Sequence, residues 1–226
     1  MSLEIFTELE QGGPEWLAAR CGIPTASVMG QLITPSTVKV AKNDYSRGLT
    51  ATLVAERITG HVEPMQVSQA MMRGQLDEPF ARDAYSEHHA PVEEIGFMVR
   101  DFGRYRIGYS PDGLVGDDGL IEIKSRAQKK HLQTILADEV PLENMAQIQT
   151  GLFVSGRHWL DYVSFCSGMP LWTKRVEPDP KWFEAITDAA LTFEANAADM
   201  LAIYRAATEH LPATERLDHF AEMEIY

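Results

Sequence analysis

The residues of this chain best suited to metal and phosphate chemistry lie in GYSPDGLVGDDGLIEIKS, at positions 108–125. Side chains alternate between the two faces of a β-strand, so a strand over 119–125 places Glu122 and Lys124 on one face and two isoleucines on the other. Asp112 follows the preceding expected strand, where a hairpin can bring it beside Glu122. The pattern therefore predicts two carboxylates and an ammonium group that converge at one point.

Converging carboxylates repel each other unless a cation lies between them. Oxygen ligands of this kind suit Mg²⁺ or Mn²⁺, which keep several waters and accept substrate phosphates. One or two such ions would polarise a phosphate and activate water, while Lys124 would orient the water or offset developing charge. An E-x-K pair is also typical of a solvated strand face with a weak salt bridge, and these residues alone leave that alternative open.

Apolar spacing and turn residues predict the elements that must position this site. The expected helices cover 14–20, 25–33, 44–59, 67–87, 128–138, 142–154 and 180–207. The expected strands cover 95–100, 104–110, 119–125, 159–166 and 171–177. Thr25 or Ser27 is expected to cap the second helix, and Trp182 to Tyr204 supply one apolar face of the last.

This order predicts an α/β (α+β) fold, with a three-strand meander leading into a central mixed sheet flanked by helices. The 226 residues, 45% of them hydrophobic, suffice for one substantial core. We expect a single domain over 1–226, with 178–226 as a C-terminal helical extension packed on the core.

The net charge of −13 argues against a nucleic-acid partner unless the charge is unevenly distributed. Residues 177–226 hold 11 acidic and 3 basic residues, so this segment carries −8 and the rest of the chain −5. A basic cluster, Lys124, Arg126, Lys129, Lys130 and His131, directly follows the expected site. A cleft can therefore carry locally the opposite sign to the whole chain.

Two isolated cysteines, Cys21 and Cys166, are typical of reduced thiols and argue against an iron–sulfur cluster, which needs four ligands. The acidic N-terminus lacks the apolar segment of a signal peptide, and no stretch is apolar enough for a membrane helix. We therefore expect a cytoplasmic protein without a membrane partner.

Five motifs occur in a characteristic order. They are W-x3-R-x4-TAS at 16–27, RGQLDE at 73–78, SPDG at 110–113, EIK at 122–124 and MAQIQ at 145–149. Together they resemble the phage lambda-type exonucleases, also called viral recombinase exonucleases, of the PD-(D/E)xK nuclease superfamily. The resemblance covers Trp16 to about Val154 and implies a restriction-endonuclease-like core.

The resemblance also implies roles for individual residues. Asp112 and Glu122 would hold Mg²⁺ with the backbone carbonyl of Ile123, and Glu78 would join them directly or through water. Lys124 would be the catalytic lysine, and Gln147 would position the water or the lysine. Judged locally, Glu78 and Gln147 would each be surface residues.

Three further positions match the family's pocket for the 5′-phosphate of a DNA end, namely Arg20, Ser27 and Ser110. Arginine is a bidentate phosphate donor, and hydroxyl groups near a helix start add further donors. The alternative for Arg20 is an ordinary helix-end cation.

The implied activity is a Mg²⁺-dependent 5′→3′ exonuclease, with Mn²⁺ able to substitute, that degrades one strand of double-stranded DNA and leaves a 3′ single strand. The resemblance also implies a ring-shaped homotrimer, a single-strand annealing protein as partner, and a phage or prophage gene expressed in a bacterial cell. Two alternatives remain: a restriction-like or repair endonuclease on the same fold, and a non-catalytic module that binds DNA ends.

Overall fold

The computed structural model describes residues 2–64 and 67–217. The helices are α1 (Pro14–Arg20), α2 (Met29–Leu32), α3 (Asp44–Thr59), α4 (Gln69–His88), α5 (Gln128–Ala137), α6 (Leu142–Ser155) and α7 (Pro180–Thr208), with a 3₁₀ turn at Ala26–Val28. The strands are β1 (Ser2–Phe6), β2 (Ile33–Thr34), β3 (Lys39–Val40), β4 (Phe97–Asp101), β5 (Arg106–Tyr109), β6 (Gly113–Val115), β7 (Gly119–Ser125), β8 (Trp159–Phe165) and β9 (Trp172–Val176).

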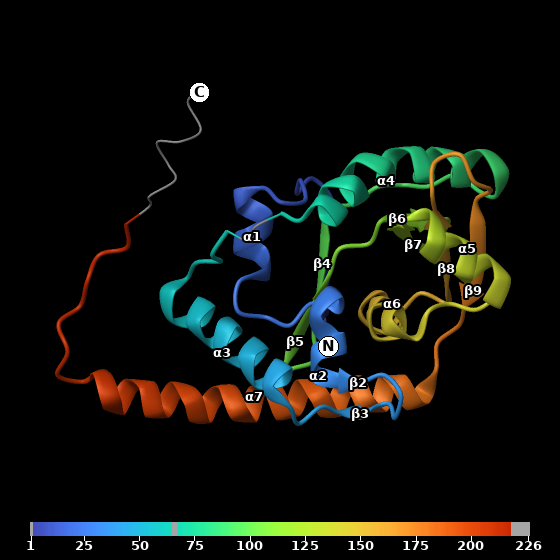
Figure 1. The fold of residues 1–226 in the computed structure, drawn as a ribbon. Helices are drawn as coiled ribbons and strands as arrows, with labels where there is room; N and C mark the ends of the chain where they lie inside the picture. The colour runs from blue at the N-terminus through green and yellow to red at the C-terminus, as the bar shows by residue number, and fades with distance from the viewer. Residues whose placement is uncertain (1, 65–66, 218–226) are drawn as a thin grey trace.

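The described strands form three hydrogen-bonded sheets. One is antiparallel, in the order β1-β4-β5, and a second is the short pair β2-β3. The third, in the order β6-β7-β8-β9, is mixed because β7 and β8 run parallel while the outer pairs are antiparallel. The expected mixed α/β class is confirmed, with helices beside the sheets (Figure 1).

The expected meander over 95–125 is wrong, because β5 pairs with β4 and not with β7. The antiparallel neighbour of β7 is β6, a three-residue strand that follows the PDG sequence. The PDG sequence predicts a turn, and β6 is not predicted, since three residues are too few to show a strand period. The strand β1 was also missed, and it lies along β4 from Ser2 to Phe6.

The central strand β7 has two differently covered faces. Ile121 and Ile123 pack against Ala81 and Tyr85 of α4. Leu120, on the opposite face, belongs to the larger core that includes α6. Since side chains alternate, Glu122 and Lys124 share the face of Leu120 and point toward α6.

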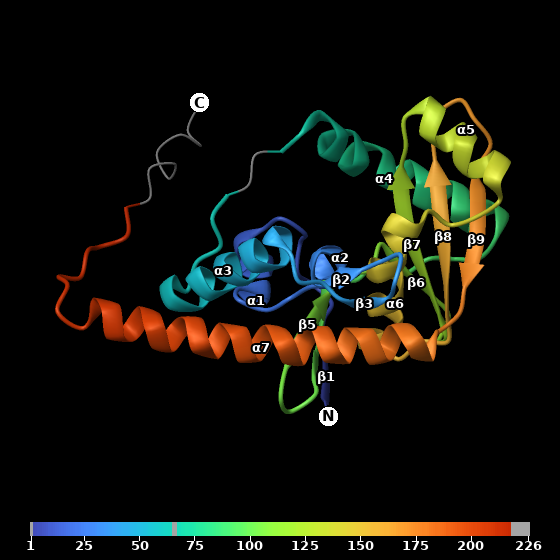
Figure 2. The same cartoon turned by 60° about the horizontal axis from the view of Figure 1, so that its bottom comes forward.

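The last helix, α7, runs along the length of the molecule beneath α3 and the β2-β3 pair (Figures 1 and 2). Asp179 caps its start by accepting a hydrogen bond from the Lys181 amide at 2.8 Å. The predicted apolar face is confirmed as far as Ala197, which is fully buried, whereas Tyr204 is 43% exposed because the helix continues beyond the core.

The final part of the predicted C-terminal extension, 218–226, lies outside the described residues. No helix of the described residues is both long and apolar enough to cross a membrane.

The helix expected over 25–33 is wrong in extent. The chain forms only a 3₁₀ turn and the four-residue α2 before Ile33 enters β2. Thr25 is extended and forms a parallel bridge with Gly108, and its hydroxyl lies 3.1 Å from that of Ser27 instead of capping a helix. A contact distant in sequence thus overrides the local helical pattern.

One ion pair ties α7 to the N-terminal helices. The guanidinium of Arg57 donates two hydrogen bonds to Glu194, at 2.7 and 2.8 Å, and a third to the Gly22 carbonyl at 2.6 Å. Both side chains of the pair are about one-quarter exposed, at 25% and 26%. We expect Glu194→Gln to lower the free energy of unfolding by about 1–2 kcal/mol, between the values typical of exposed and buried pairs.

Chemical denaturation of this variant would measure the change. Arg47→Gln is a suitable control because it removes an exposed ion pair with Asp44 on the same helix α3 and should cost less than about 0.5 kcal/mol. Equal losses in the two variants would contradict the structural role of the Arg57–Glu194 pair.

Candidate active site

The β6–β7 hairpin brings the two predicted carboxylates together. Gly113 pairs with Ile121, so Asp112, one residue earlier, lies beside Glu122. One oxygen of Asp112, Oδ2, accepts a hydrogen bond from the Ile123 amide at 2.6 Å. This contact holds the aspartate against the strand that carries the glutamate and the lysine.

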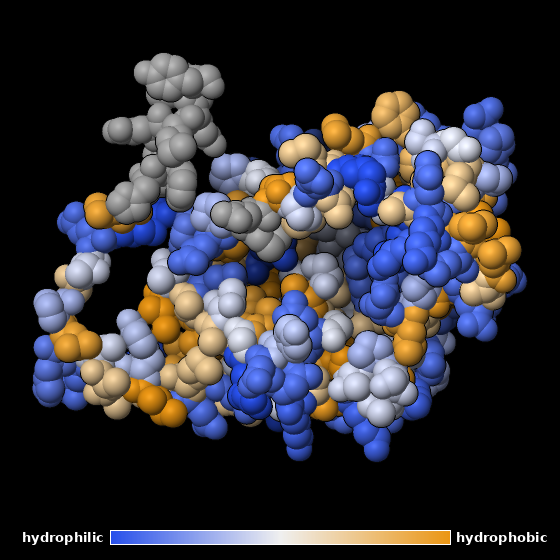
Figure 3. All heavy atoms as spheres, viewed as in Figure 1, coloured by the Kyte–Doolittle hydropathy of each residue, from blue (hydrophilic) through white to orange (hydrophobic). Residues whose placement is uncertain are grey.

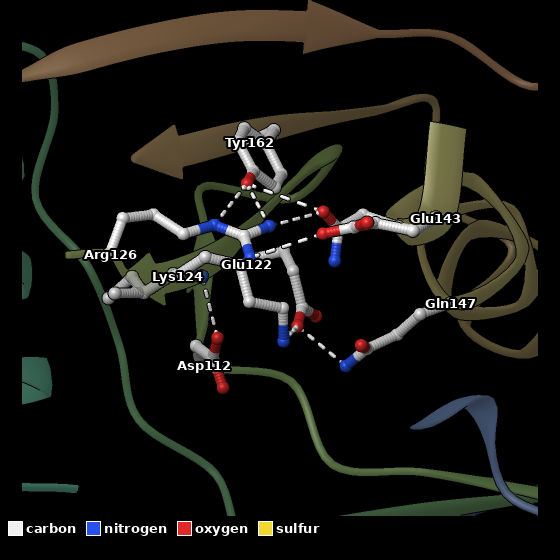
Figure 4. Close-up of polar contacts among 9 residues, drawn as sticks. Asp112, Glu122, Lys124, Arg126, Glu143, Gln147 and Tyr162 are labelled. Carbon is white, nitrogen blue, oxygen red and sulfur yellow. Dashed lines mark hydrogen bonds and ion pairs between the residues drawn. The ribbon is translucent and has the colours of Figure 1, made fainter. Parts of the chain in front are cut away.

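Glu122 is the centre of the site, and its side chain is only 1% exposed. Its Oε1 accepts hydrogen bonds from Lys124 Nζ at 2.6 Å and from Gln147 Nε2 at 2.5 Å (Figure 4). Its Oε2 is buried and has no hydrogen-bond partner among the described residues. The alternative interpretations of a solvated E-x-K face and of Gln147 as a surface residue are therefore wrong.

Burial disfavours the ionised forms of the carboxyl groups in this site. Burial raises the pKa of Glu122 to about 8, with Lys124 opposing the rise and Asp112 adding to it. Burial also raises the pKa of Asp112, and burial followed by the charge of Asp112 raises the pKa of Glu78 to about 7 despite Arg82. Burial by itself lowers the pKa of Lys124, but Glu122 and Asp112 outweigh it, so this pKa is raised and the ammonium stays protonated.

Glu78, on α4, lies at the edge of this group and contacts it through Arg82. The Arg82 guanidinium donates to Glu78 Oε1 at 2.5 Å and to the Asp112 carbonyl at 3.0 Å, and it pairs with Glu94 at 2.8 Å. Glu78, Arg82, Glu94 and Asp112 also line an open cavity of about 490 Å³. The local interpretation of Glu78 as a solvent-facing acid is wrong, since its side chain is 27% exposed and ion-paired.

The three residues of the predicted phosphate pocket belong to one polar cluster around Trp16. Arg20 lies over the Trp16 ring at 4.3 Å and donates to the Thr25 hydroxyl at 3.3 Å, which in turn contacts Ser27. The Trp16 indole donates to the Ser110 hydroxyl at 2.8 Å. Because only Pro111 separates Ser110 from Asp112, the cluster lies next to the acidic group along the chain.

The donor set fits a divalent cation. Within residues 2–64 and 67–217, no three His, Cys, Asp or Glu side chains are grouped closely enough to hold a metal ion by themselves. Mg²⁺ commonly binds through one or two carboxylates and completes its shell with water and substrate phosphate. The buried, unpartnered Oε2 of Glu122 beside Asp112 meets that requirement, because a buried carboxylate oxygen without a partner is costly.

Arg82, which organises this region, is not predicted from the sequence, while Thr25 and Arg126 are predicted only as a possible helix cap and as a member of a basic cluster. Each also contacts a segment distant along the chain, namely Gly108 for Thr25, Asp112 for Arg82 and Tyr162 for Arg126. The prediction that His131 belongs to the basic cluster is wrong, since this side chain is fully buried and hydrogen-bonded to Ser164 and the Pro170 carbonyl.

Figure 3 shows a mostly hydrophilic face that is hollowed near its centre.

The fold is that of the alkaline exonucleases. An alkaline exonuclease from Laribacter hongkongensis superposes with a TM-score of 0.77 and 32% identity, covering 87% of this chain and 99% of that chain. The structure of the same enzyme in complex with dAMP gives the same score and identity, with 88% and 100% covered. The model of the YqaJ-like viral recombinase domain matches residues 15–158, and this chain belongs to that family.

The motif-based resemblance is therefore confirmed at the level of the family. A phage-related exonuclease from Haemophilus somnus 129PT shares the fold at 11% identity, with a TM-score of 0.61 and coverage of 80% of this chain and 96% of that chain. No curated protein matches the chain.

Proposed function

We propose that this protein is a Mg²⁺-dependent DNA exonuclease that degrades one strand of a duplex from its 5′ end and leaves a 3′ single strand. The observation that carries the proposal is the Glu122 carboxylate, which is buried, held on one oxygen by Lys124 and Gln147, and unpartnered on the other among the described residues. The family membership and the alkaline exonuclease relatives support phosphodiester hydrolysis as the reaction.

In this proposal Asp112, Glu122 and the Ile123 carbonyl hold one or two Mg²⁺ or Mn²⁺ ions, with Glu78 assisting directly or through water. When bound, the cation supplies positive charge to the scissile phosphate and to the leaving oxygen. Lys124 remains protonated and points at the same carboxylate, so its ammonium group is placed to offset charge on the phosphate or to orient the attacking water. Gln147 restrains the carboxylate from the opposite side through its amide.

The polarity of digestion would follow from the cluster around Trp16. Arg20, Ser27 and Ser110 would bind the terminal 5′-phosphate. Because Ser110 is two residues along the chain from Asp112, the first phosphodiester bond would then meet the acidic group. The guanidinium of Arg20 is partly buried, which strengthens its hydrogen bonds to a phosphate.

We expect Arg20→Ala to reduce the preference for 5′-phosphorylated over 5′-hydroxyl ends by about tenfold or more, since a hydrogen bond to a charged group contributes about 1.5–3 kcal/mol. Initial rates on matched duplexes with the two kinds of end would measure the ratio. Arg104→Ala, which removes an exposed arginine from a distant turn, should leave the ratio unchanged. A wild-type enzyme that digests both ends equally would refute the pocket.

The wider biological setting is also part of the proposal. We expect residues 1–226 to act as a single nuclease domain whose C-terminal helical segment packs on the core, and to assemble as a ring-shaped homotrimer around DNA. The YqaJ-like viral recombinase family supports a phage or prophage role in recombination, in the bacterial cytoplasm, with a single-strand annealing protein as partner.

One experiment tests the activity, its metal requirement and its polarity together. A linear duplex labelled at either 5′ or 3′ end is digested with Mg²⁺ and, separately, with a chelator. The proposal expects mononucleotides released from the 5′ end only when Mg²⁺ is present. A covalently closed circular duplex should resist digestion, because cleavage of the circle would favour the endonuclease alternative.

A further inference from the structure

A second polar network lies beside the acidic group and centres on Arg126. Its guanidinium donates to Asn144 Oδ1 at 2.5 Å, to the Tyr162 hydroxyl at 2.8 and 3.3 Å, and to Glu143 at 3.4 Å (Figure 4). The Arg126 side chain is 13% exposed, and Tyr162 is fully buried. These contacts join the end of β7, the first turn of α6 and the middle of β8.

The network and the acidic group share the same strands and the same helix. Tyr162 is the register partner of Glu122 in the parallel β7–β8 pair, so the two side chains project from the same face of the sheet. Asn144 and Gln147 are three residues apart on α6 and therefore lie on one side of the helix. Arg126 thus holds α6 one turn before the residue that contacts Glu122.

The start of α6 needs such an attachment. The residue preceding the helix is Pro141, whose side chain cannot accept hydrogen bonds from the first amides. Asn144 is 9% exposed, and its carboxamide oxygen receives the shortest of the Arg126 hydrogen bonds. The guanidinium uses three nitrogens for these contacts: Nη2 donates to Asn144 and Tyr162, Nε to Tyr162, and Nη1 to Glu143. A lysine ammonium presents its donors from one atom and cannot reproduce the whole set.

We propose that Arg126 is a positioning residue that sets the distance of Gln147 from the Glu122 carboxylate by fixing the first turn of α6 to the sheet. The inference rests on the proposed function. Arg126 acts through Gln147 and need not touch the DNA, because its donors are directed at protein acceptors on β8 and α6.

The test is a double-mutant cycle of Arg126→Lys and Gln147→Ala, with turnover measured on a 5′-labelled duplex in Mg²⁺. A small displacement of a positioning group can cost as much as 10²-fold in rate, so we expect Arg126→Lys to lower kcat by about tenfold with KM within about twofold. In the Gln147→Ala background the same substitution should have little further effect, because its route to Glu122 is already lost. Glu143→Gln is the matched control, since it removes the exposed ion-pair partner of Arg126 and leaves the Asn144 and Tyr162 contacts in place.

Several outcomes would overturn the inference. Independent, multiplicative effects of the two substitutions, or an Arg126→Lys enzyme with wild-type kcat, would show that Arg126 does not act through Gln147. A different result would identify Arg126 as a residue that binds DNA. In that case KM would rise, and the slope of the logarithm of DNA affinity against the logarithm of salt concentration would fall by about one, the value for one lost phosphate contact.

A second measurement separates this inference from the proposed function. Backbone hydrogen exchange over 142–150 should be faster in Arg126→Lys than in the wild type and unchanged in Glu143→Gln, whatever reaction the protein catalyses. Unchanged exchange in Arg126→Lys would refute the anchoring role. An inactive wild type with the expected exchange pattern would refute the proposed function and leave the anchor standing.

Discussion

Lys124→Ala is expected to lower DNA cleavage by about 10²–10³-fold, the loss typical of removing one group that stabilises charge in a transition state. The ammonium group lies 2.6 Å from Glu122 Oε1, and its raised pKa keeps it charged across the neutral range. The side chain is 27% exposed, so its removal should leave the fold intact. DNA binding should also persist, since the substitution spares the cluster around Trp16.

Single-turnover cleavage and equilibrium DNA binding, measured on the same preparation, would test this expectation. Lys181→Ala is the matched control because it removes an exposed lysine at the start of α7, outside the predicted basic cluster, and it should cleave at the wild-type rate. Full activity in Lys124→Ala would end the catalytic assignment. A loss of binding that equals the loss of cleavage would make Lys124 a DNA-contacting residue.

The metal-free protein is expected to lose stability as pH rises from about 5 to 8. The pKa of Glu122 rises from 4.5 to about 8 on folding, and that of Glu78 from 4.5 to about 7, in both cases chiefly because of burial. In this interval the unfolded chain has released these protons while the folded chain still holds them. The free energy of unfolding therefore falls as pH rises. Stability is therefore greatest below pH 4.5 with respect to these two groups, and it declines as pH passes through their folded-state pKa values.

Mg²⁺ should reverse this decline, because a cation stabilises the ionised carboxylates. At about 100 times its Kd, an ion that binds only the folded chain adds about 2.7 kcal/mol to the free energy of unfolding, and the gain should be larger at pH 8 than at pH 6. Thermal unfolding with Mg²⁺ or chelator at several pH values would measure it. Glu122→Gln should weaken both the pH dependence of stability without metal and the pH dependence of the stabilisation by Mg²⁺. Asp199→Asn, which changes an exposed acid on α7, should alter neither. A gain that is equal at both pH values would contradict the assignment of these carboxylates as ligands.

The sequence predicts the central part of the site because the relevant contacts are local. Two-residue alternation puts Glu122 and Lys124 on one face, and the hairpin formed by 113–121 places Asp112 beside them, as the structure confirms. The long helices α3, α4, α6 and α7 are also predicted to within a few residues, since each has many turns over which an apolar period can be recognised.

The rest depends on partners that are distant along the chain. β1 acquires its structure from β4, more than 90 residues later, and Thr25 is extended because it bridges to Gly108. Arg82 has ordinary sequence surroundings and Arg126 is predicted only as one of several basic residues, because their particular contacts arise where α4, α6 and β8 meet the hairpin. Pattern analysis of one sequence cannot identify such contacts, because they are properties of the tertiary arrangement.

The parallel pairing of β7 with β8 has a consequence for synthesis on the ribosome. A parallel neighbour requires a crossover, here supplied by α5 and α6, so β7 gains its second flanking strand only after residue 165 has been made. Until then Gln147 has no completed sheet to pack against, and the Glu122 carboxylate lies at an open sheet edge. A nascent chain that stops short of β8 therefore cannot complete the site, which delays any reactivity toward DNA until most of the polypeptide has emerged.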